Sequence, residues 1–380
     1  FDFYMSDLNA RAVILWSEMD SPARDIARKQ NIPILELTPT LSAEAGSFEL
    51  AGINKATPSR TDFARSDDTA LVLHTSGTTA RPKIVPLTHL NLSCSAHNIS
   101  FTLGLTSKDR CLNIMPLFHI HGLIGAVLSS LRAGASVFCT PGVDVEKFFE
   151  WVEEIHPTWY TAVPTMHQAI LSRATAHHEV LARSPMRFIR SSSAAVPEPV
   201  MAALEDVFKA PVIESYGMTE AAHQMTSNPL SPFPRKAGSV GIAAGPDVGI
   251  MDEHGQLLPA GDIGEVVIRG ANVTSGYENN PSANKSAFTN GWFRTGDQGR
   301  FDAEGYLFLT GRLKEMINRG GEKIAPKEVD EVLNQHPAIA QAIAFAVPHP
   351  TLGEDVAAAI VLKESAVVTE REILDFAAAR

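Results

Sequence analysis

The stretch LHTSGTTARPKIVPLTH, residues 73–89, decides how the rest of the chain is interpreted. The apolar residues 71–73 lead into a run of hydroxyl side chains around one glycine, and the run closes on Lys83. Hydroxyl groups, backbone amides and a lysine bind phosphate, and a glycine lets the backbone approach it closely. The stretch therefore predicts a strand that leads into an anion-binding loop.

The loop does not match the P-loop pattern G-x-x-x-x-G-K-[ST]. It contains one glycine, Gly77, and Lys83 follows a proline instead of a second glycine. A surface turn rich in serine and threonine would have the same composition. Taken alone, the loop leaves phosphate binding and a plain turn open as alternatives.

The composition indicates a globular protein and argues against several other classes. The 380 residues are enough for two or three hydrophobic cores, and 44% hydrophobic with 20% charged residues is ordinary for a globular protein. The net charge of -11 with no basic block argues against nucleic-acid binding. No stretch predicts a membrane span, and Cys94, Cys111 and Cys139 lack the spacing of metal ligands.

Both ends of the chain look truncated. It begins without methionine or a signal-peptide core, and it stops while the helical pattern EREILDFAAAR is still running. We expect a cytoplasmic protein with reduced cysteines. If the protein carried a C-terminal peroxisomal targeting signal, that signal would lie beyond Arg380.

The hydrophobic pattern predicts an α/β protein in three parts. Short apolar strands alternate with helical segments from residue 69 to about 217, which predicts a parallel sheet covered on both faces. Glycine-rich alternating runs over 235–311 predict a small antiparallel barrel or sheet. Past Arg312, a helix with Pro326 in its first turn and two strand-like runs predict a small α+β domain. The predicted domains are 1–234, 235–312 and 313–380.

Four segments together resemble the adenylate-forming superfamily, which contains acyl-CoA synthetases, luciferases and peptide-synthetase adenylation domains. They are the loop itself, SYGMTE (215–220), WFRTGDQGRF (292–301) and GRLKEMINRGGEKIAPKEVD (311–330), in the order that the superfamily has them. The resemblance implies the adenylate-forming enzyme fold. This has a large N-terminal domain, made of parallel αβ layers and a small β-barrel subdomain, and a small α+β C-terminal domain.

The resemblance also implies a ligase that uses ATP, Mg²⁺, CoA and a small-molecule carboxylate. A carboxylate is a poor electrophile because oxide would have to leave. Attack on the α-phosphorus of ATP converts it into an acyl-adenylate and releases pyrophosphate, and a thiol then displaces AMP. The protein mainly has to neutralise charge where two anions meet. No enzyme nucleophile is needed, and the sequence shows no convincing Ser-His-Asp or Cys-His arrangement.

The matching positions imply residue roles. Lys83, Thr219, Glu220 and His119 would be catalytic, and Glu220 would hold Mg²⁺ together with phosphate. Tyr216 would stack on adenine, and Asp297 would accept hydrogen bonds from the ribose hydroxyls. The predicted nucleotide-binding set is Thr75, Ser76, Gly77, Thr78, Thr79, Lys83, Ser193, Ala194, Ala195, Glu214, Ser215, Tyr216, Gly217, Thr219, Asp297 and Arg312.

Three further positions belong to the second half-reaction. By resemblance, Lys314 lies at the hinge about which the small domain rotates, and Gly320 and Gly321 line the path of the CoA arm. Each role has a structural alternative: a solvated lysine for Lys314 and a plain glycine turn for the other two. A packed core tyrosine would likewise explain Tyr216, and a turn-stabilising residue would explain Asp297.

Two departures from the superfamily pattern stand out. Its lysine near the far C-terminus has no counterpart before Arg380, so we expect weak or no adenylation by this chain alone. Ile84 replaces the glycine that usually follows the loop lysine.

The segments expected beside the acid are polar. They supply His119, His121, His223 and the hydroxyls of Ser191, Ser192 and Ser193. Burying these groups is costly unless they find polar partners, and imidazole can become cationic, which suits an acid with a second anionic group. Four further sequence segments are similar to those of the oxalate–CoA ligases of plants and fungi: FHIHG, RSSSA, TEAAHQMTSNPL and KAGSVG. We therefore predict a short dicarboxylate, oxalate first.

Other interpretations stay open at this point. His119 would gate the CoA channel if the histidines are not substrate ligands, and His121 and His223 would then be packing residues. The chain would otherwise be a medium- or long-chain fatty acyl-CoA ligase, an adenylation domain that feeds a carrier protein, or a non-catalytic nucleotide-binding fragment.

Overall fold

The computed structural model describes residues 1–52, 62–75 and 82–379, and contacts divide the chain into two compact units, 1–63 and 64–380. The first unit packs two helices and three strands around a small core that includes Met5, Leu15 and Ala27. Strand β1 is parallel to β2, and β3 is antiparallel to β2. The elements are α1 (Asp2–Asp7), β1 (Val13–Trp16), α2 (Pro22–Lys29), β2 (Ile34–Pro39) and β3 (Phe48–Ala51).

The centre of the second unit is a seven-stranded sheet with the order β12-β11-β10-β9-β8-β6-β7. The five strands from β10 to β7 are parallel, and the two at the other edge are antiparallel. This confirms the predicted parallel sheet. The strands are β6 (Arg110–Asn113), β7 (Ser136–Cys139), β8 (Trp159–Ala162), β9 (Phe188–Ser191), β10 (Val212–Met218), β11 (His223–Ser227) and β12 (Ile242–Ala243).

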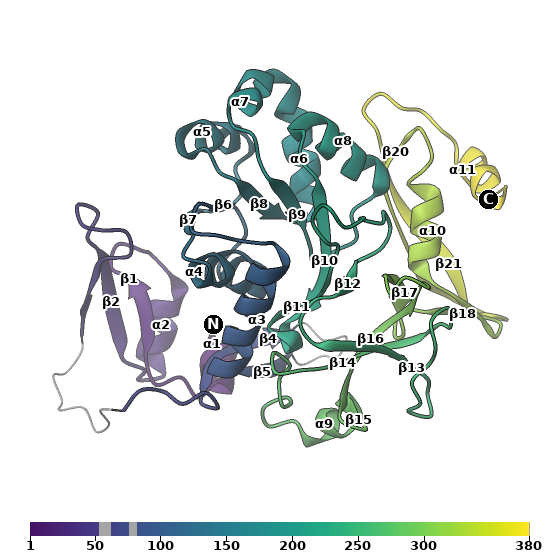
Figure 1. Ribbon diagram of the computed structural model, residues 1–380. Coiled ribbons are helices and arrows are strands. Elements are labelled where there is room, and N and C mark those ends of the chain that lie inside the picture. The colour runs from purple at the N-terminus through teal and green to yellow at the C-terminus, as the bar shows by residue number, and fades with distance from the viewer. Residues whose placement is uncertain (53–61, 76–81, 380) are drawn as a thin grey trace. The chain divides into compact units, whose positions relative to one another are not determined.

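Helices cover both faces of this sheet (Figure 1). One face packs with Ile99 of α3 (His89–Thr102) and with the segment that ends in α4 (Ser129–Arg132). The other face carries α5 (Val145–Ile155), α6 (Pro164–Ala174), α7 (His178–Arg183) and α8 (Glu198–Phe208). The layered arrangement predicted from the alternating pattern is confirmed.

The strand predicted at residues 69–75 exists, but its assignment to the parallel series is wrong. β4 (Thr69–Thr75) pairs only with β5 (Lys83–Thr88), as a two-stranded antiparallel sheet. The connection between them is too short for the crossover that parallel pairing requires, so the chain returns antiparallel. Thr88 then caps α3 through a reciprocal capping box with Asn91.

The helical segment that begins at His121 is in part a π-helix. Its first two turns, His121–Leu128, are π-helical, and α4 continues from there. A Cβ on Gly122 would lie 2.5 Å from the carbonyl oxygen of Pro116, so this close turn tolerates only glycine. π-Helical segments are rare and often occur at functional sites.

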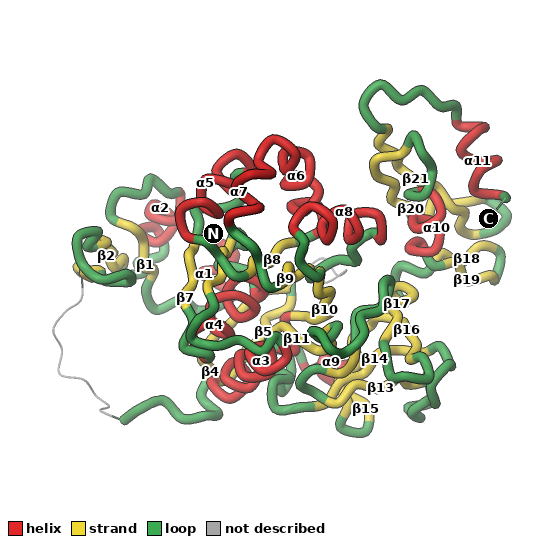
Figure 2. The backbone as a smooth tube through the Cα atoms, turned by 45° about the horizontal axis from the view of Figure 1, so that its top comes forward, coloured by secondary structure: helices red, strands yellow, loops and turns green. Residues whose placement is uncertain are grey.

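The remaining strands form two antiparallel sheets. A five-stranded sheet occupies most of the region predicted as an antiparallel sheet, and Figure 2 shows its strands apart from the helices α5 to α8. Its elements are β13 (Asp247–Met251), β14 (Gly264–Arg269), α9 (Pro281–Ala287), β15 (Phe288–Thr289), β16 (Trp292–Phe301) and β17 (Leu307–Arg312).

The last part has the predicted α+β composition. Its four-stranded sheet has the order β19-β18-β21-β20. The elements are β18 (Ile317–Arg319), β19 (Glu322–Ile324), α10 (Pro326–Leu333), β20 (Ile339–His349), β21 (Gly353–Leu362) and α11 (Glu370–Ala378). The domain boundaries at 234/235 and 312/313 stay predictions. In the described part of the chain, no helix has the length and hydropathy needed to cross a membrane.

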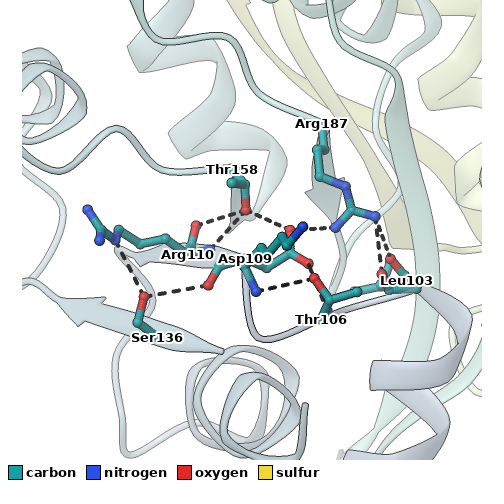
Figure 3. Close-up of polar contacts among 9 residues, drawn as sticks. Leu103, Thr106, Asp109, Arg110, Ser136, Thr158 and Arg187 are labelled. Carbon is teal, nitrogen blue, oxygen red and sulfur yellow. Dashed lines mark hydrogen bonds and ion pairs between the residues drawn. The ribbon is translucent and has the colours of Figure 1, made fainter. Parts of the chain in front are cut away.

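A buried carboxylate ties together the amino ends of three parallel strands (Figure 3). Asp109, which precedes β6, is 3% exposed and accepts hydrogen bonds from the backbone and hydroxyl of Thr106. It also accepts from the hydroxyl of Thr158 (2.9 Å), before β8, and from the guanidinium of Arg187 (2.5 Å), before β9. Arg187 continues the network to the carbonyls of Leu103 and Gly104 after α3. The network lies at the strand ends opposite those where parallel sheets bind ligands.

Replacing Asp109 by alanine should lower the free energy of unfolding by about 2–4 kcal/mol, because Thr106, Thr158 and Arg187 lose the buried acceptor that they share. Equilibrium urea unfolding, followed by tryptophan fluorescence, measures the loss. The matched control is Asp206→Ala, which removes an exposed pair with Lys209 and should leave the unfolding midpoint unchanged. Equal midpoints for the two variants would contradict a stabilising network.

Candidate active site

The carboxyl ends of β6, β8, β9 and β10 lie side by side because these strands are neighbours in one sheet. Ligands bind at this edge in open parallel αβ sheets. Six of the predicted site residues lie in the segments that follow these strands: His119 and His121 after β6, Ser192 and Ser193 after β9, and Thr219 and Glu220 after β10.

Lys83 and Glu220 meet at Tyr277. The Tyr277 hydroxyl donates to Oε1 of Glu220 (2.8 Å), and Nζ of Lys83 lies 4.3 Å from the centre of the Tyr277 ring. Burial raises the pKa of Glu220, while the Tyr277 hydroxyl and the charge of Lys83 oppose that shift. Burial lowers the pKa of Lys83, Glu220 opposes this, and the nearby charge of Lys314 adds to it. Tertiary structure thus places the loop lysine, the predicted metal ligand and the predicted hinge lysine within electrostatic reach of one another.

The rest of the opening loop is only partly described. Thr75 ends β4 opposite Lys83 in the antiparallel pair. Ser76, Gly77, Thr78 and Thr79 lie outside the described residues.

Glu220 suits a magnesium ion that is shared with phosphates. Across residues 1–52, 62–75 and 82–379, no cluster of three or more histidine, cysteine, aspartate or glutamate side chains could hold a metal by itself. Mg²⁺ usually takes one or two carboxylates and completes its shell with water and substrate phosphates. A single buried carboxylate near a lysine fits this mode of binding.

Tyr277→Phe should lower kcat/KM for ATP about tenfold, because one hydrogen bond to a charged group is lost. The acid limb of the pH–rate profile should also move to higher pH. The hydroxyl of Tyr277 lowers the pKa of Glu220, so its removal raises that pKa and the carboxylate ionises later.

Tyr306 provides a matched control for this variant. Its hydroxyl donates to the carbonyl of Pro234, and Nζ of Lys236 lies 4.5 Å from its ring centre. Tyr306→Phe should leave the pH profile unchanged. The same shift in both variants would show that the effect is general and does not arise at Glu220.

Asp297 connects the two predicted nucleoside contacts. It is 6% exposed and accepts hydrogen bonds from the hydroxyl of Tyr216 and from Nε of Arg312 (2.9 Å). Strand register explains the second contact, because Asp297 of β16 lies opposite Arg312 of β17. Burial and the charge of Asp297 raise the pKa of Tyr216 and keep its hydroxyl a donor. These three residues, distant in sequence, form one polar group.

The other predicted nucleotide contacts lie on β10 and after β9. Glu214 is buried and accepts from the backbone of Val196 (3.1 Å), and burial raises its pKa to about 7. Gly217 is required by packing, because an added Cβ would fall 1.7 Å from the carbonyl oxygen of His223. Ser215 is buried, whereas Ser193, Ala194 and Ala195 form an exposed turn after β9.

The predicted acid-side residues form a second, buried group. The ring of His121 lies between the hydroxyls of Ser193 (3.0 Å from Nδ1) and Thr161 (2.6 Å from Nε2). The ring stacks on that of His223, with centroids 5.1 Å apart. Ser192 is buried and donates to the carbonyl of Ser215, while His119 is exposed and its Nδ1 accepts from the His121 amide.

The positive charge in this group belongs to Arg190. Its Nη1 lies 2.9 Å from Nε2 of His223, and its Nη2 donates to Gln224. Burial, reinforced by the arginine charge, holds the pKa of both His121 and His223 well below the usual range. The expectation that these imidazoles become cationic is therefore wrong for His121 and His223. Desolvation and a neighbouring cation both favour the neutral ring.

Two residues of the site were missed from the sequence. An arginine inside the apolar strand MRFIRS was a usable signal for Arg190, because a buried charge needs an explanation. Tyr277 had no local signal, since it lies 57 residues from Glu220 in the chain.

The predicted hinge and CoA-side residues lie around the last sheet. Lys314 is exposed in the turn after β17. Gly320 and Gly321 form the two-residue turn between β18 and β19, with φ values of 63° and 100° that suit a tight hairpin. Their roles toward CoA stay predictions.

Comparisons with known proteins show which family and fold this chain is similar to. The family model described as AMP-binding enzyme matches residues 2–278, and the AMP-binding enzyme C-terminal domain matches 328–380. The chain is 46% identical to an oxalate–CoA ligase of Arabidopsis thaliana, over 99% of this chain and 74% of that protein. It is 36% identical to a sulfoacetate–CoA ligase of Cupriavidus necator, over 96% of this chain and 70% of that protein. Its fold is similar to ATP-bound MatB from Rhodopseudomonas palustris, with a TM-score of 0.86 and 30% identity over 100% of this chain and 74% of that one.

Proposed function

This chain belongs to the AMP-binding enzyme family and is an ATP-dependent, AMP-forming acid–CoA ligase, and from that premise we propose that the acid it activates is a short dicarboxylate, oxalate first. The similarity to ATP-bound MatB confirms the predicted adenylate-forming enzyme fold. The finer division into domains, the roles of individual residues and the cytoplasmic location stay proposals.

One observation supports the proposed acid more than any other. The group formed by the predicted acid-side residues contains two buried histidines and several hydroxyls, and the structure adds a fully buried arginine, Arg190, beside His223. A fatty acyl chain would leave the charge of the arginine uncompensated in an apolar environment, at considerable cost. A second carboxylate on a short acid would instead compensate the arginine charge.

The names of two relatives point the same way. Oxalate has two carboxylates, and sulfoacetate has a carboxylate and a sulfonate, so both are short and doubly anionic. A site that selects acids of this kind needs a fixed positive charge at the end remote from the reacting carboxylate.

For adenylation we propose that the chain supplies charge and orientation. Lys83, on the ring of Tyr277, neutralises the phosphates. Glu220 holds Mg²⁺, and the bound ion would neutralise further phosphate charge. Asp297 receives the ribose hydroxyls, and Tyr216 lies against the adenine.

For thioester formation we propose that rotation at Lys314 brings the turn of Gly320 and Gly321 to the site. His119, exposed at the start of the π-helical segment, lies on the path of the thiol. No side chain has to form a covalent intermediate.

The test is ATP–pyrophosphate exchange by the protein expressed from its complete reading frame, with oxalate, malonate, octanoate and palmitate as acids. Oxalate should have a kcat/KM at least about 100-fold above palmitate, since an unpaired buried polar site rejects an apolar ligand strongly. Preference for octanoate or palmitate would overturn the dicarboxylate proposal. ATP binding without exchange for any acid would favour the non-catalytic alternative.

A further inference from the structure

Arg190 is a buried cation without a counter-ion. It lies on β9, opposite Thr161 of β8 and Ile213 of β10, and its relative exposure is 0%. No carboxylate pairs with it among the described residues, and its Nε has no hydrogen-bond partner there. Burial lowers its pKa to about 10, so the side chain is still charged at neutral pH. A charge in this position is very unfavourable unless something compensates it.

The groups around Arg190 do not supply that compensation. The nearby thiol of Cys111 is neutral, because burial raises its pKa well above the usual range. The remaining partners are the neutral side chains of His223 and Gln224. A negatively charged ligand nearby would supply the missing compensation.

The contact with Arg190 also decides the tautomer of His223. A guanidinium can only donate hydrogen bonds, so Nε2 of His223 accepts and the proton lies on Nδ1. The ring is held closely, because a Cβ on Gly125 would lie 2.6 Å from its Nε2 and 3.1 Å from Nη1 of Arg190. The backbone of His223 has φ = 106°, which a side-chain-bearing residue rarely adopts. Strain of this kind persists where the surrounding structure enforces it, often at functional sites.

We propose that Arg190 is a positioning residue that selects a doubly anionic acid through His223: it fixes the ring as a neutral Nδ1–H donor and polarises that donor toward the second carboxylate. This inference rests on the proposed dicarboxylate function and adds the residue pair that carries the selectivity. A donor polarised by an adjacent cation binds an anion more strongly than it binds a neutral group of the same shape.

The test compares oxalate with oxamate, which replaces the second carboxylate by an amide of nearly the same size. Arg190→Met removes the charge with little change in volume. In the protein expressed from its complete reading frame, kcat/KM for oxalate should fall about 100-fold, while oxamate should change less than about threefold and KM for ATP should stay the same. Arg190→Lys keeps a charge and should recover part of the oxalate activity.

The pH profile supplies a readout that a merely structural role would not change. Burial and the charge of Arg190 lower the pKa of His223, so wild-type selectivity should be flat between about pH 6 and 8. In Arg190→Met that charge is gone and the pKa of His223 rises. The ring then gains charge as pH falls, and the residual preference for oxalate should increase toward about pH 6.

A second variant keeps the test decisive if Arg190→Met is poorly folded. Gly125→Ala leaves every charge in place but pushes the His223 ring away from the guanidinium, so it should also lower the oxalate-to-oxamate ratio. Equal losses for oxalate and oxamate with an unchanged pH profile would overturn the role of Arg190 alone. A wild-type protein that activates neither oxalate nor malonate would overturn the proposed function together with this inference.

Discussion

Replacing Lys83 by methionine is expected to lower the rate of ATP–pyrophosphate exchange by about 100- to 1,000-fold, which is the usual effect of removing one charge that stabilises a transition state. Lys83 lies over the ring of Tyr277 and near Glu220, so its charge is held in place. Methionine fills the same volume against the ring, and the fold should persist. Exchange kinetics with oxalate, at saturating and limiting ATP, separate the loss in kcat from the rise in KM.

Two companion variants make this result specific. Lys285→Met removes an exposed lysine of α9 and should leave the exchange rate unchanged. Lys83→Arg keeps the positive charge. Because burial lowers the pKa of Lys83, wild-type activity should fall at alkaline pH as the amine deprotonates, and an arginine should move this fall to higher pH. Full activity of Lys83→Met would contradict the phosphate-binding role.

Replacing His223 by alanine should lower kcat/KM for oxalate about 100-fold and leave KM for ATP unchanged, because the donor toward the acid is lost while the nucleotide contacts stay. The ring also contacts Arg190 and stacks on His121, so the substitution removes a hydrogen-bond acceptor from the buried guanidinium. Steady-state kinetics with each substrate varied in turn measure both values.

Controls for His223 separate chemistry from folding. His223→Gln keeps a hydrogen-bond donor and should retain more oxalate activity than alanine does. His254→Ala removes an exposed histidine of the turn after β13 and should change neither value. Parallel losses in oxalate use and ATP affinity for His223→Ala would identify His223 as a structural residue.

Local elements were predictable because their signals lie close together in the chain. Thr88 caps α3, Pro164 and Pro326 begin α6 and α10, and short apolar runs form β6 to β10. The pairing of β4 with β5 was not predicted correctly. Residues 69–75 were predicted as a strand and residues 83–88 were not, and an apolar run does not say which neighbour it will pair with.

The sequence by itself determined the family, the reaction class and the residues expected at the nucleotide, because four short segments carry these in order. Only the tertiary structure decided which groups meet. Tyr277 reaches Glu220 and Arg190 reaches His223 across 57 and 33 residues of chain. It also decided which groups are charged: His121 and His223, which the sequence suggested as cations, are buried and neutral, and Arg190 beside them holds the charge. Protonation depends on desolvation and on charges nearby in space, and neither can be obtained from the order of residues along the chain.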